Sequence, residues 1–481
     1  MENSDERLIK VNLPGGVVSA GDLYEILLIA EKAGAEQIRF GNRQQLYFTT
    51  DAENLDDLEN DMLSAEISYE VDNDYYPNMV SSYVADSIFN NETWLKEGVY
   101  KDIFDLFAFK PLLKINLIDS NQTFVPFFTG NLNFISSDVS NYWYLYVRYP
   151  KTSTIYCWPC LIYSDDIPRI SKKIEEVIFL NKDKFYDQQE IDSELLYKMV
   201  MAKSNFVIQN YTQALKLPEF HLPYYEGFNK YGNKYWLGIY RRNELFDLGF
   251  LKDICTLCMQ TRVGQLYVTP WKSVLIKGIE IAGRNQWGNI LNKYRVNVRH
   301  ASNELNWQIE DVCSYCLELK KYLVRELEEA DARTYRLCFA IKKQPKTGLF
   351  GSIIIRKQQD ELFEIIHTRD FNPNSKDFVI YLQNVEEKDL SKHLISLCNL
   401  FYSTHSEDSE IHSNNSDDPE NLVVNDKKIV HQCKNCLTIY DSIYGDELNG
   451  IAPGTDFTEI GDDYNCPVCD TVKEDFLLVE K

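Results

Sequence analysis

A chain of 481 residues is too long for one ordinary domain and predicts two to four. Its formal net charge of −23 argues against the phosphate backbone of a nucleic acid as a partner. The first residues lack a basic segment followed by an apolar run, and no apolar stretch approaches the length of a membrane span, so we expect neither a secretory signal nor a membrane segment. The 12 cysteines, most of them in CxxC pairs, then indicate metal or thiol chemistry in a reducing cytoplasm rather than disulfides.

The chain opens with a pattern of alternating strands and a helix. Residues 8–13 alternate as a strand does, and residues 23–34 predict an amphipathic helix with capping residues before it and Gly34 at its end. A strand at 37–40 follows, and a polar turn leads to a further apolar stretch. A similar pattern recurs at residues 246–279, which indicates an internal repeat.

This repeated unit resembles the ferredoxin-like half domain of siroheme nitrite and sulfite reductases. Arg39, Arg43 and Gln44 match the arginine, polar turn and Arg-Gln of that family. The resemblance implies an α+β fold in which the half-domain repeat combines with reductase-like α/β domains. The expected boundaries are 1–70 and 236–300 for the two half domains, 71–235 for a central domain and 301–402 for a cluster domain.

Residues 109–116 and 130–134 fall where the reductases have a basic strand and an Asn-rich strand. Only Lys114 aligns with the lysines that contact siroheme in that family, and a buried strand with one solvated lysine is the alternative. If the body binds siroheme, the resemblance implies that its carboxylates pair with basic residues, namely Arg39, Arg43, Lys114 and Lys272.

The family also holds a [4Fe–4S] cluster on two cysteine pairs that follow the second half domain. In this chain Cys313 and Cys316 are more closely spaced than the first pair of the family, and Cys338 lacks a partner because Lys342 occupies that position. A cubane held by four thiolates cannot form as it does in the family. We interpret the region as a degenerate cluster site.

Four other cysteines of the body form two CxxC pairs. Cys157 and Cys160 lack the strand-to-helix context of a redox pair, whereas Cys255 and Cys258 lie on a predicted helix and favour core packing. The alternative is that these pairs meet in space and hold a second metal. Cys398 fits a core position.

The body is expected to end with a helix at 390–402. The acidic, polar residues that follow predict a flexible linker at 403–428. Such a tether keeps its cargo close to the body and lets it move.

Residues 429–481 contain two further CxxC pairs, whose four thiolates match the ligand count of one tetrahedral metal, zinc or iron. The intervening turn at 453–457 and the aromatic residue before the second pair resemble rubredoxin, the small iron protein of electron transfer. The resemblance implies one iron on Cys433, Cys436, Cys466 and Cys469. It also implies a small aromatic core, made of Tyr440, Phe457, Tyr464 and Phe476. Leu437 and Asp470 depart from the glycine that usually follows each CxxC.

Three functions follow from these patterns. The first is a carrier of single electrons that serves redox partner proteins in nitrate, nitrite or sulfite assimilation, with the body as a docking platform. The second is a siroheme-dependent nitrite or sulfite reductase fed by its own rubredoxin. The third is a non-redox scaffold with a structural zinc.

Overall fold

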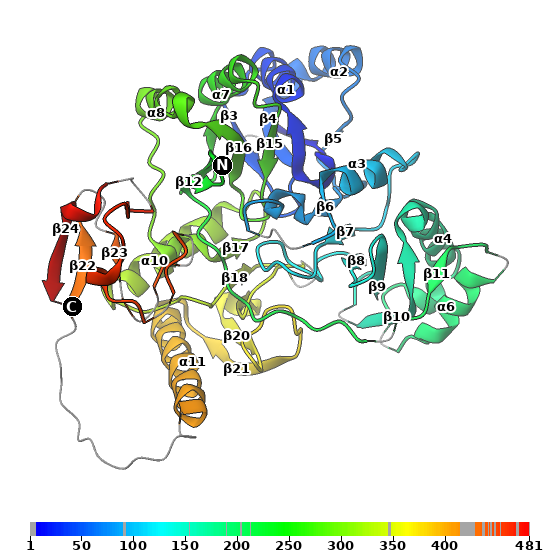
Figure 1. Ribbon diagram of the computed structural model, residues 1–481. Coiled ribbons are helices and arrows are strands. Elements are labelled where there is room, and N and C mark those ends of the chain that lie inside the picture. The colour runs from blue at the N-terminus through cyan, green and yellow to red at the C-terminus, as the bar shows by residue number, and fades with distance from the viewer. Residues whose placement is uncertain are drawn as a thin grey trace.

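The protein is described by a computed structural model (Figure 1). The described residues are 6–89, 93–152, 154–188, 190–202, 204–211, 213–344, 348–413, 429–434, 438–440, 442, 445–446, 449–452, 454–467 and 471–480. Within them the chain forms four sheets in a large body and a small fifth sheet near the C-terminus. The fold is mixed α+β, as the sequence predicts. No helix in the described part of the chain is long and apolar enough to cross a membrane.

Two interlocked five-stranded sheets form the half-domain repeat. Their strand orders are β14-β3-β4-β1-β5 and β12-β13-β16-β15-β2. Each repeat therefore gives one short strand to the sheet of the other. The elements are β1 (Glu6–Val11), β2 (Val17–Ser19), α1 (Ala20–Lys32), β3 (Gln37–Phe40), β4 (Leu46–Asp51), α2 (Leu55–Ser64), β5 (Tyr69–Val71), β12 (Gly227–Tyr231), β13 (Lys234–Ile239), β14 (Phe246–Asp247), α7 (Leu248–Thr261), β15 (Gln265–Val268), β16 (Val274–Glu280) and α8 (Arg284–Lys293).

The two equivalent helices of the repeat, α1 and α7, begin in the same way. The Ser19 side chain accepts a hydrogen bond from the backbone N–H of Asp22, and the Asp247 carboxylate accepts one from that of Phe250. These caps satisfy amide groups that the first helical turn leaves unpaired. The apolar faces of both helices share one core with the sheets beneath them, and the helices lie side by side in Figure 1.

The central region is a six-stranded sheet with the order β11-β10-β9-β8-β7-β6. Its parallel strands β6, β7 and β8 are followed by antiparallel pairings, and its core is rich in tryptophan, tyrosine and phenylalanine. Its elements are β6 (Val80–Ser81), α3 (Glu97–Asp105), β7 (Ile115–Ile118), β8 (Leu132–Ser136), β9 (Tyr142–Arg148), β10 (Ile155–Tyr163), α4 (Ile167–Leu180), α5 (Lys182–Phe185), α6 (Ser193–Met201) and β11 (Ile208–Gln209).

A fourth sheet, with the order β17-β18-β19-β20-β21, completes the body. Its elements are α9 (Ser302–Leu305), β17 (Trp307–Ile309), α10 (Ser314–Glu329), β18 (Phe339–Lys342), β19 (Ile353–Lys357), β20 (Phe363–Thr368), β21 (Phe378–Val385) and α11 (Leu390–Ser413). Helix α11 extends beyond its predicted end at residue 402 into the segment that we expected to be a flexible linker. No glycine or proline interrupts this stretch, and the Ser403 and Thr404 hydroxyls bond back to carbonyls of the helix. Linker residues 414–428 lie outside the described residues.

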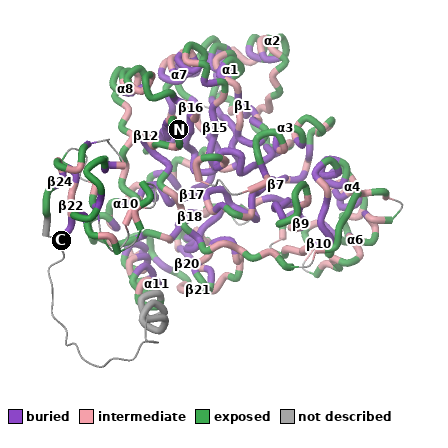
Figure 2. The backbone as a smooth tube through the Cα atoms, in the orientation of Figure 1, coloured by how far each residue is buried: buried purple, intermediate pink, exposed green. Residues whose placement is uncertain are grey.

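The C-terminal sheet has the order β23-β22-β24, with β22 (Ile429–Cys433), β23 (Ile439–Tyr440) and β24 (Phe476–Glu480). It has its own small core, separate from those of the body. Figure 2 shows that buried residues follow the body strands, whereas the outward faces of the helices are exposed.

Candidate metal centre and the reductase-like cavity

The two CxxC loops of the C-terminal sheet close with the same hydrogen bond. The backbone N–H of Cys433 donates to the carbonyl of Thr438, and the N–H of Cys466 donates to that of Thr471, both at 2.8 Å. In each case the donor is the first cysteine of its pair and the acceptor follows at the same spacing. The two loops are therefore related by local symmetry.

The residues that flank the loops repeat this relation. Gln432, just before the first pair, is opposite Ile439, and Asn465, just before the second, is opposite Val472. Each pairing is antiparallel and spans the same number of residues. The described parts of the two loops thus repeat one another, as expected for two CxxC loops that share a tetrahedral metal.

The described cysteines of the two loops suit a metal site. Cys433 and Cys466 are both fully buried in the small core. The other two predicted ligands, Cys436 and Cys469, lie outside the described residues, as do Leu437 and Asp470. The predicted donor set of four soft thiolates fits iron or zinc. A metal commonly stabilises domains with a core this small.

Phe457 is the centre of the aromatic core predicted for this domain. Its ring lies 5.1 Å from Phe476, 5.3 Å from Tyr440 and 6.0 Å from Tyr464, measured between centroids. Edge and tilted contacts at these separations stabilise aromatic clusters. The sequence analysis missed His431, which stacks on Phe457 at 4.1 Å. The sequence could have indicated this contact, because His431 is two residues before Cys433 on the same strand, β22.

The polar ends of this core are satisfied. The Tyr440 hydroxyl donates to the carbonyl of Thr455 at 2.7 Å, and the Tyr464 hydroxyl donates to the Asp446 carboxylate at 3.0 Å. The Asp456 carboxylate accepts from the N–H of Thr458 and fixes the turn that carries Phe457. Burial lowers the pKa of His431, which favours the neutral ring against Phe457.

In the body, two of the predicted cofactor-binding residues line one cavity of about 380 Å³, Arg43 and Lys114. Arg43 is buried and donates to the carbonyls of Asn78 and Ile115 and to the Asn116 side chain. Burial lowers the pKa of Arg43 to about 10. Burial, together with the nearby Arg43 charge, lowers the pKa of Lys114 to about 8.

The other two predicted residues are placed differently. The Lys272 ammonium is 2.8 Å from the Glu244 carboxylate and 3.4 Å from that of Asp311. Burial by itself would lower its pKa, but these two carboxylates hold the pKa of Lys272 above its ordinary value. Arg39 lines a separate surface depression of about 510 Å³. The structure therefore does not gather the four cations.

Three further cations that the sequence did not assign to a site are half-buried: Arg148, Lys342 and Lys376. Burial lowers the pKa of Arg148 to about 10. Burial, with repulsion from Arg148 and Lys342, lowers the pKa of Lys376 to about 7. These residues come from distant strands and loops, so no local pattern identifies them.

The cavity beside Arg43 and Lys114 also carries three carboxylates, those of Asp74, Glu310 and Asp311. A tetrapyrrole that bears several carboxylates needs a lining with an excess of positive charge, because buried like charges repel. This mixed lining does not fit siroheme in the way that the reductase family holds it.

The cysteines at the degenerate cluster site do not converge on one point. Cys313 and Cys316 are adjacent, with their sulfurs 2.6 Å apart. Among the described residues, the one group that could hold a metal combines this pair with Glu310 and does not include Cys338. Cys338 is buried, and its thiol faces the carbonyl of Phe350.

The remaining two CxxC pairs of the body lie within regular secondary structure, one on α7 and one on β10. Cys255 and Cys258 are fully buried on α7, as the helical pattern indicates. Cys157 and Cys160 lie on β10, at an irregularity in its pairing with β9. Burial raises the pKa of both of these β10 thiols.

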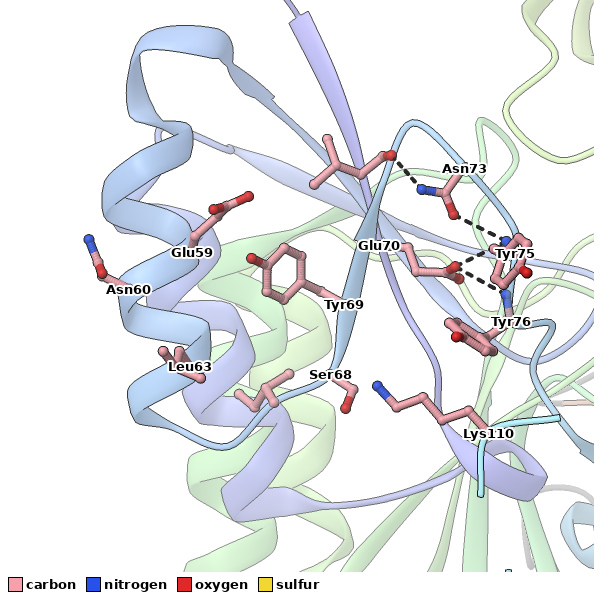
Figure 3. Close-up of a pocket in the computed structure, with 12 residues that line it drawn as sticks. Glu59, Asn60, Leu63, Ser68, Tyr69, Glu70, Asn73, Tyr75, Tyr76 and Lys110 are labelled. Carbon is pink, nitrogen blue, oxygen red and sulfur yellow. Dashed lines mark hydrogen bonds between the residues drawn. The ribbon is translucent and has the colours of Figure 1, made fainter. Parts of the chain in front are cut away.

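A larger depression of about 770 Å³, between α2, β5 and Lys110, contains none of the predicted site residues (Figure 3). Its polar groups are used within the fold. The Glu70 carboxylate accepts from the backbone N–H groups of Tyr75 and Tyr76 and pairs with Lys10.

A small domain with two matched CxxC loops, joined to a larger α+β body, is the class of protein that this fold and these loops define. The family model described as Rubredoxin matches residues 430–476, and the model described as Nitrite/Sulfite reductase ferredoxin-like half domain matches residues 1–65. Rubredoxin from Acinetobacter baylyi is 46% identical over 50 residues, which are 10% of this chain and 93% of that protein. Through its C-terminal domain, the chain belongs to the rubredoxin family.

Other relatives share only that segment. Rubredoxin-2 from Ectopseudomonas oleovorans is 49% identical over 49 residues, which are 10% of this chain. This chain spans 28% of the length of that relative. For the body, the structure of the Mycobacterium tuberculosis NirA protein matches with a TM-score of 0.61 at 14% identity, covering 81% of this chain and 80% of that one. The body therefore has a NirA-like fold.

Proposed function

We propose that this protein carries single electrons on one iron held by Cys433, Cys436, Cys466 and Cys469. The observation that supports this most strongly is the matched closure of the two CxxC loops around buried Cys433 and Cys466. Iron in a cage of four thiolates cycles between ferrous and ferric states and has no open coordination site for a substrate. The chain's own residues exclude water from the centre through the Phe457 core and fix the loops through backbone hydrogen bonds.

The partners in this proposal are redox proteins, an electron donor and an acceptor reductase of nitrate, nitrite or sulfite assimilation, in the cytoplasm. This class of partner rests on the NirA-like fold of the body alone. The acidic chain suits docking to basic patches on a partner, because complementary charge accelerates encounter.

A siroheme-dependent reductase is the second candidate, and the observation that favours it is that the buried Arg43 and the half-buried Lys114 line one cavity. We place it second because Asp74, Glu310 and Asp311 share that cavity and Lys272 is already paired.

Metal analysis and a visible spectrum of the full chain, purified from iron-replete cells, test both candidates. We expect one iron per chain and the broad visible absorption of ferric iron bound by thiolates. Cys433→Ser should abolish or shift that absorption, whereas Cys157→Ser, a matched cysteine of the body, should leave it unchanged. Zinc in place of iron, or a colourless protein, would contradict the proposal. Strong additional bands that Lys114→Met removes would instead support siroheme.

A further inference from the structure

The CxxC pair Cys313–Cys316 has no part in the proposed iron centre, yet it is built as a reactive thiol site. Cys313 is the N-cap of the 16-residue helix α10, and its sulfur accepts a hydrogen bond from the backbone N–H of Cys316 at 3.3 Å. The first turn of α10 carries no acidic residue. The N-terminus of α10 therefore supplies a hydrogen-bond donor to the Cys313 sulfur, a placement typical of reactive cysteines.

The two thiols of the pair differ in access. Cys313 is half-buried, whereas Cys316 is fully buried behind it. Burial raises the pKa of the Cys316 thiol well above its ordinary value. An accessible sulfur that reacts first, next to a buried sulfur that reacts second, is the arrangement that thiol–disulfide exchange requires.

The turn before the helix is held in a strained conformation. Val312 has a left-handed backbone with φ of 54°, which a β-branched residue adopts only when its surroundings impose it. On its N-terminal side the Asp311 carboxylate accepts from the N–H of Asn42 at 3.0 Å and pairs with Lys272. These Asp311 contacts hold the turn that places Cys313 at the start of the helix.

A metal site at this pair is less consistent with the geometry. The ligand atoms of Glu310, Cys313 and Cys316 lie within 4.8 Å of one another. A structural zinc site takes four protein ligands, whereas this group among the described residues offers three. The Glu310 carboxylate also accepts from the backbone N–H groups of Lys343 and Gln344.

We propose that Cys313 and Cys316 form a redox-active dithiol that exchanges with the disulfide of a small thiol. Cys313 keeps part of its surface exposed to a small molecule, and its neighbours Val312 and Ser314 line the surface depression of about 510 Å³. Glutathione disulfide is the probe of this chemical class.

The exchange proceeds in two displacements. The Cys313 thiolate attacks one sulfur of the small disulfide, whose S–S bond breaks; a mixed disulfide forms, and one small thiolate leaves and takes up a proton. Cys316 then loses its proton to solvent and attacks the Cys313 sulfur, which expels the second small thiol. The protein dithiol is oxidised by two electrons, and the small disulfide is reduced to two thiols.

The test uses the full iron-loaded chain, glutathione disulfide, rapid alkylation and peptide mapping by mass spectrometry. We expect a Cys313–Cys316 disulfide in the unsubstituted protein. Cys316→Ser should stop at a glutathione adduct on Cys313, and Cys313→Ser should slow modification of Cys316 at least tenfold. Cys157 is the internal control, because it is also half-buried and has the same CxxC spacing but lies on a strand. It should react at least tenfold more slowly than Cys313.

Equal reaction rates at Cys313 and Cys157 in the unsubstituted chain would overturn the proposal, even if a variant failed to fold. Protection of the pair from alkylation by zinc alone, with no exchange in its absence, would also overturn it. The visible iron absorption reports on the C-terminal domain separately. A Cys313→Ser/Cys316→Ser variant should keep that absorption and lose the exchange.

Discussion

Replacing Phe457 by alanine tests whether the aromatic core keeps the iron domain closed. The ring is 6% exposed and contacts His431, Tyr440, Tyr464 and Phe476. Truncating a buried phenylalanine to alanine costs about 3–5 kcal/mol. The domain is small, so this loss is a large part of the free energy that opposes opening of its core.

The expected effect on iron release follows from this free energy. Where opening precedes capture by a chelator, the release rate follows the population of the open form. Each 1.4 kcal/mol is about a factor of ten, so Phe457→Ala should release iron about a hundredfold to a few thousandfold faster.

Decay of the visible absorption in excess chelator measures this rate directly. Leu478→Ala is the matched control, because Leu478 is on β24 of the same domain and is 68% exposed. An exposed substitution changes stability by about 0.5 kcal/mol or less, so its rate should stay within about twofold to threefold of the unsubstituted chain. Similar iron release from the two variants would refute the role assigned to the aromatic core.

Three further predictions concern charges and turns. Lys272→Met should lower the stability of the body by about 3–5 kcal/mol in denaturant unfolding, because it leaves the buried Glu244 carboxylate uncompensated; added Glu244→Gln should restore part of the loss. For Lys114 the folded-state pKa of about 8 lies below the unfolded value of about 10.4, so the unfolded state binds more protons between these values and this lysine makes stability rise with pH there. Lys114→Met should reduce that rise and stabilise the body at pH 7 by up to about 3 kcal/mol; an unchanged pH profile in the variant would contradict this. Gly445→Ala should accelerate iron loss, because φ is +63° and a Cβ would lie 2.5 Å from a backbone carbonyl, whereas Gly450→Ala, with positive φ and open space, should have a smaller effect.

The local elements of the repeat were predictable because their signals are local. Ser19 before an amphipathic run and Gly34 after it define α1, and the structure confirms both, with Gly34 at a φ of +86°. The exchange of strands between the repeats was not predictable. Phe246 pairs with Ile38 across a separation of some two hundred residues, and β14 is too short to carry a pattern of its own.

The C-terminal metal centre and the cavity of the body differ in the same way, because only the first is defined by a local sequence pattern. The predicted iron ligands and the aromatic core follow a compact motif, so spacing within one small domain is enough to predict their positions. The electrostatic state of a basic residue depends instead on partners that the fold brings from elsewhere. Nothing near Lys272 in the sequence indicates that Glu244 and Asp311 neutralise it.

Asp311 links the polar cavity to the thiol pair of α10. Its carboxylate lines the cavity beside Lys114, pairs with Lys272 and accepts from the N–H of Asn42, and it is two residues before Cys313. A positive charge that would otherwise be available to an anionic cofactor therefore stabilises the loop that places Cys313 at the helix N-terminus. The Lys272–Asp311 ion pair thus has two effects. It weakens the siroheme assignment, because it neutralises a cation near the cavity. It also favours a reactive dithiol, because Asp311 holds the turn before Cys313.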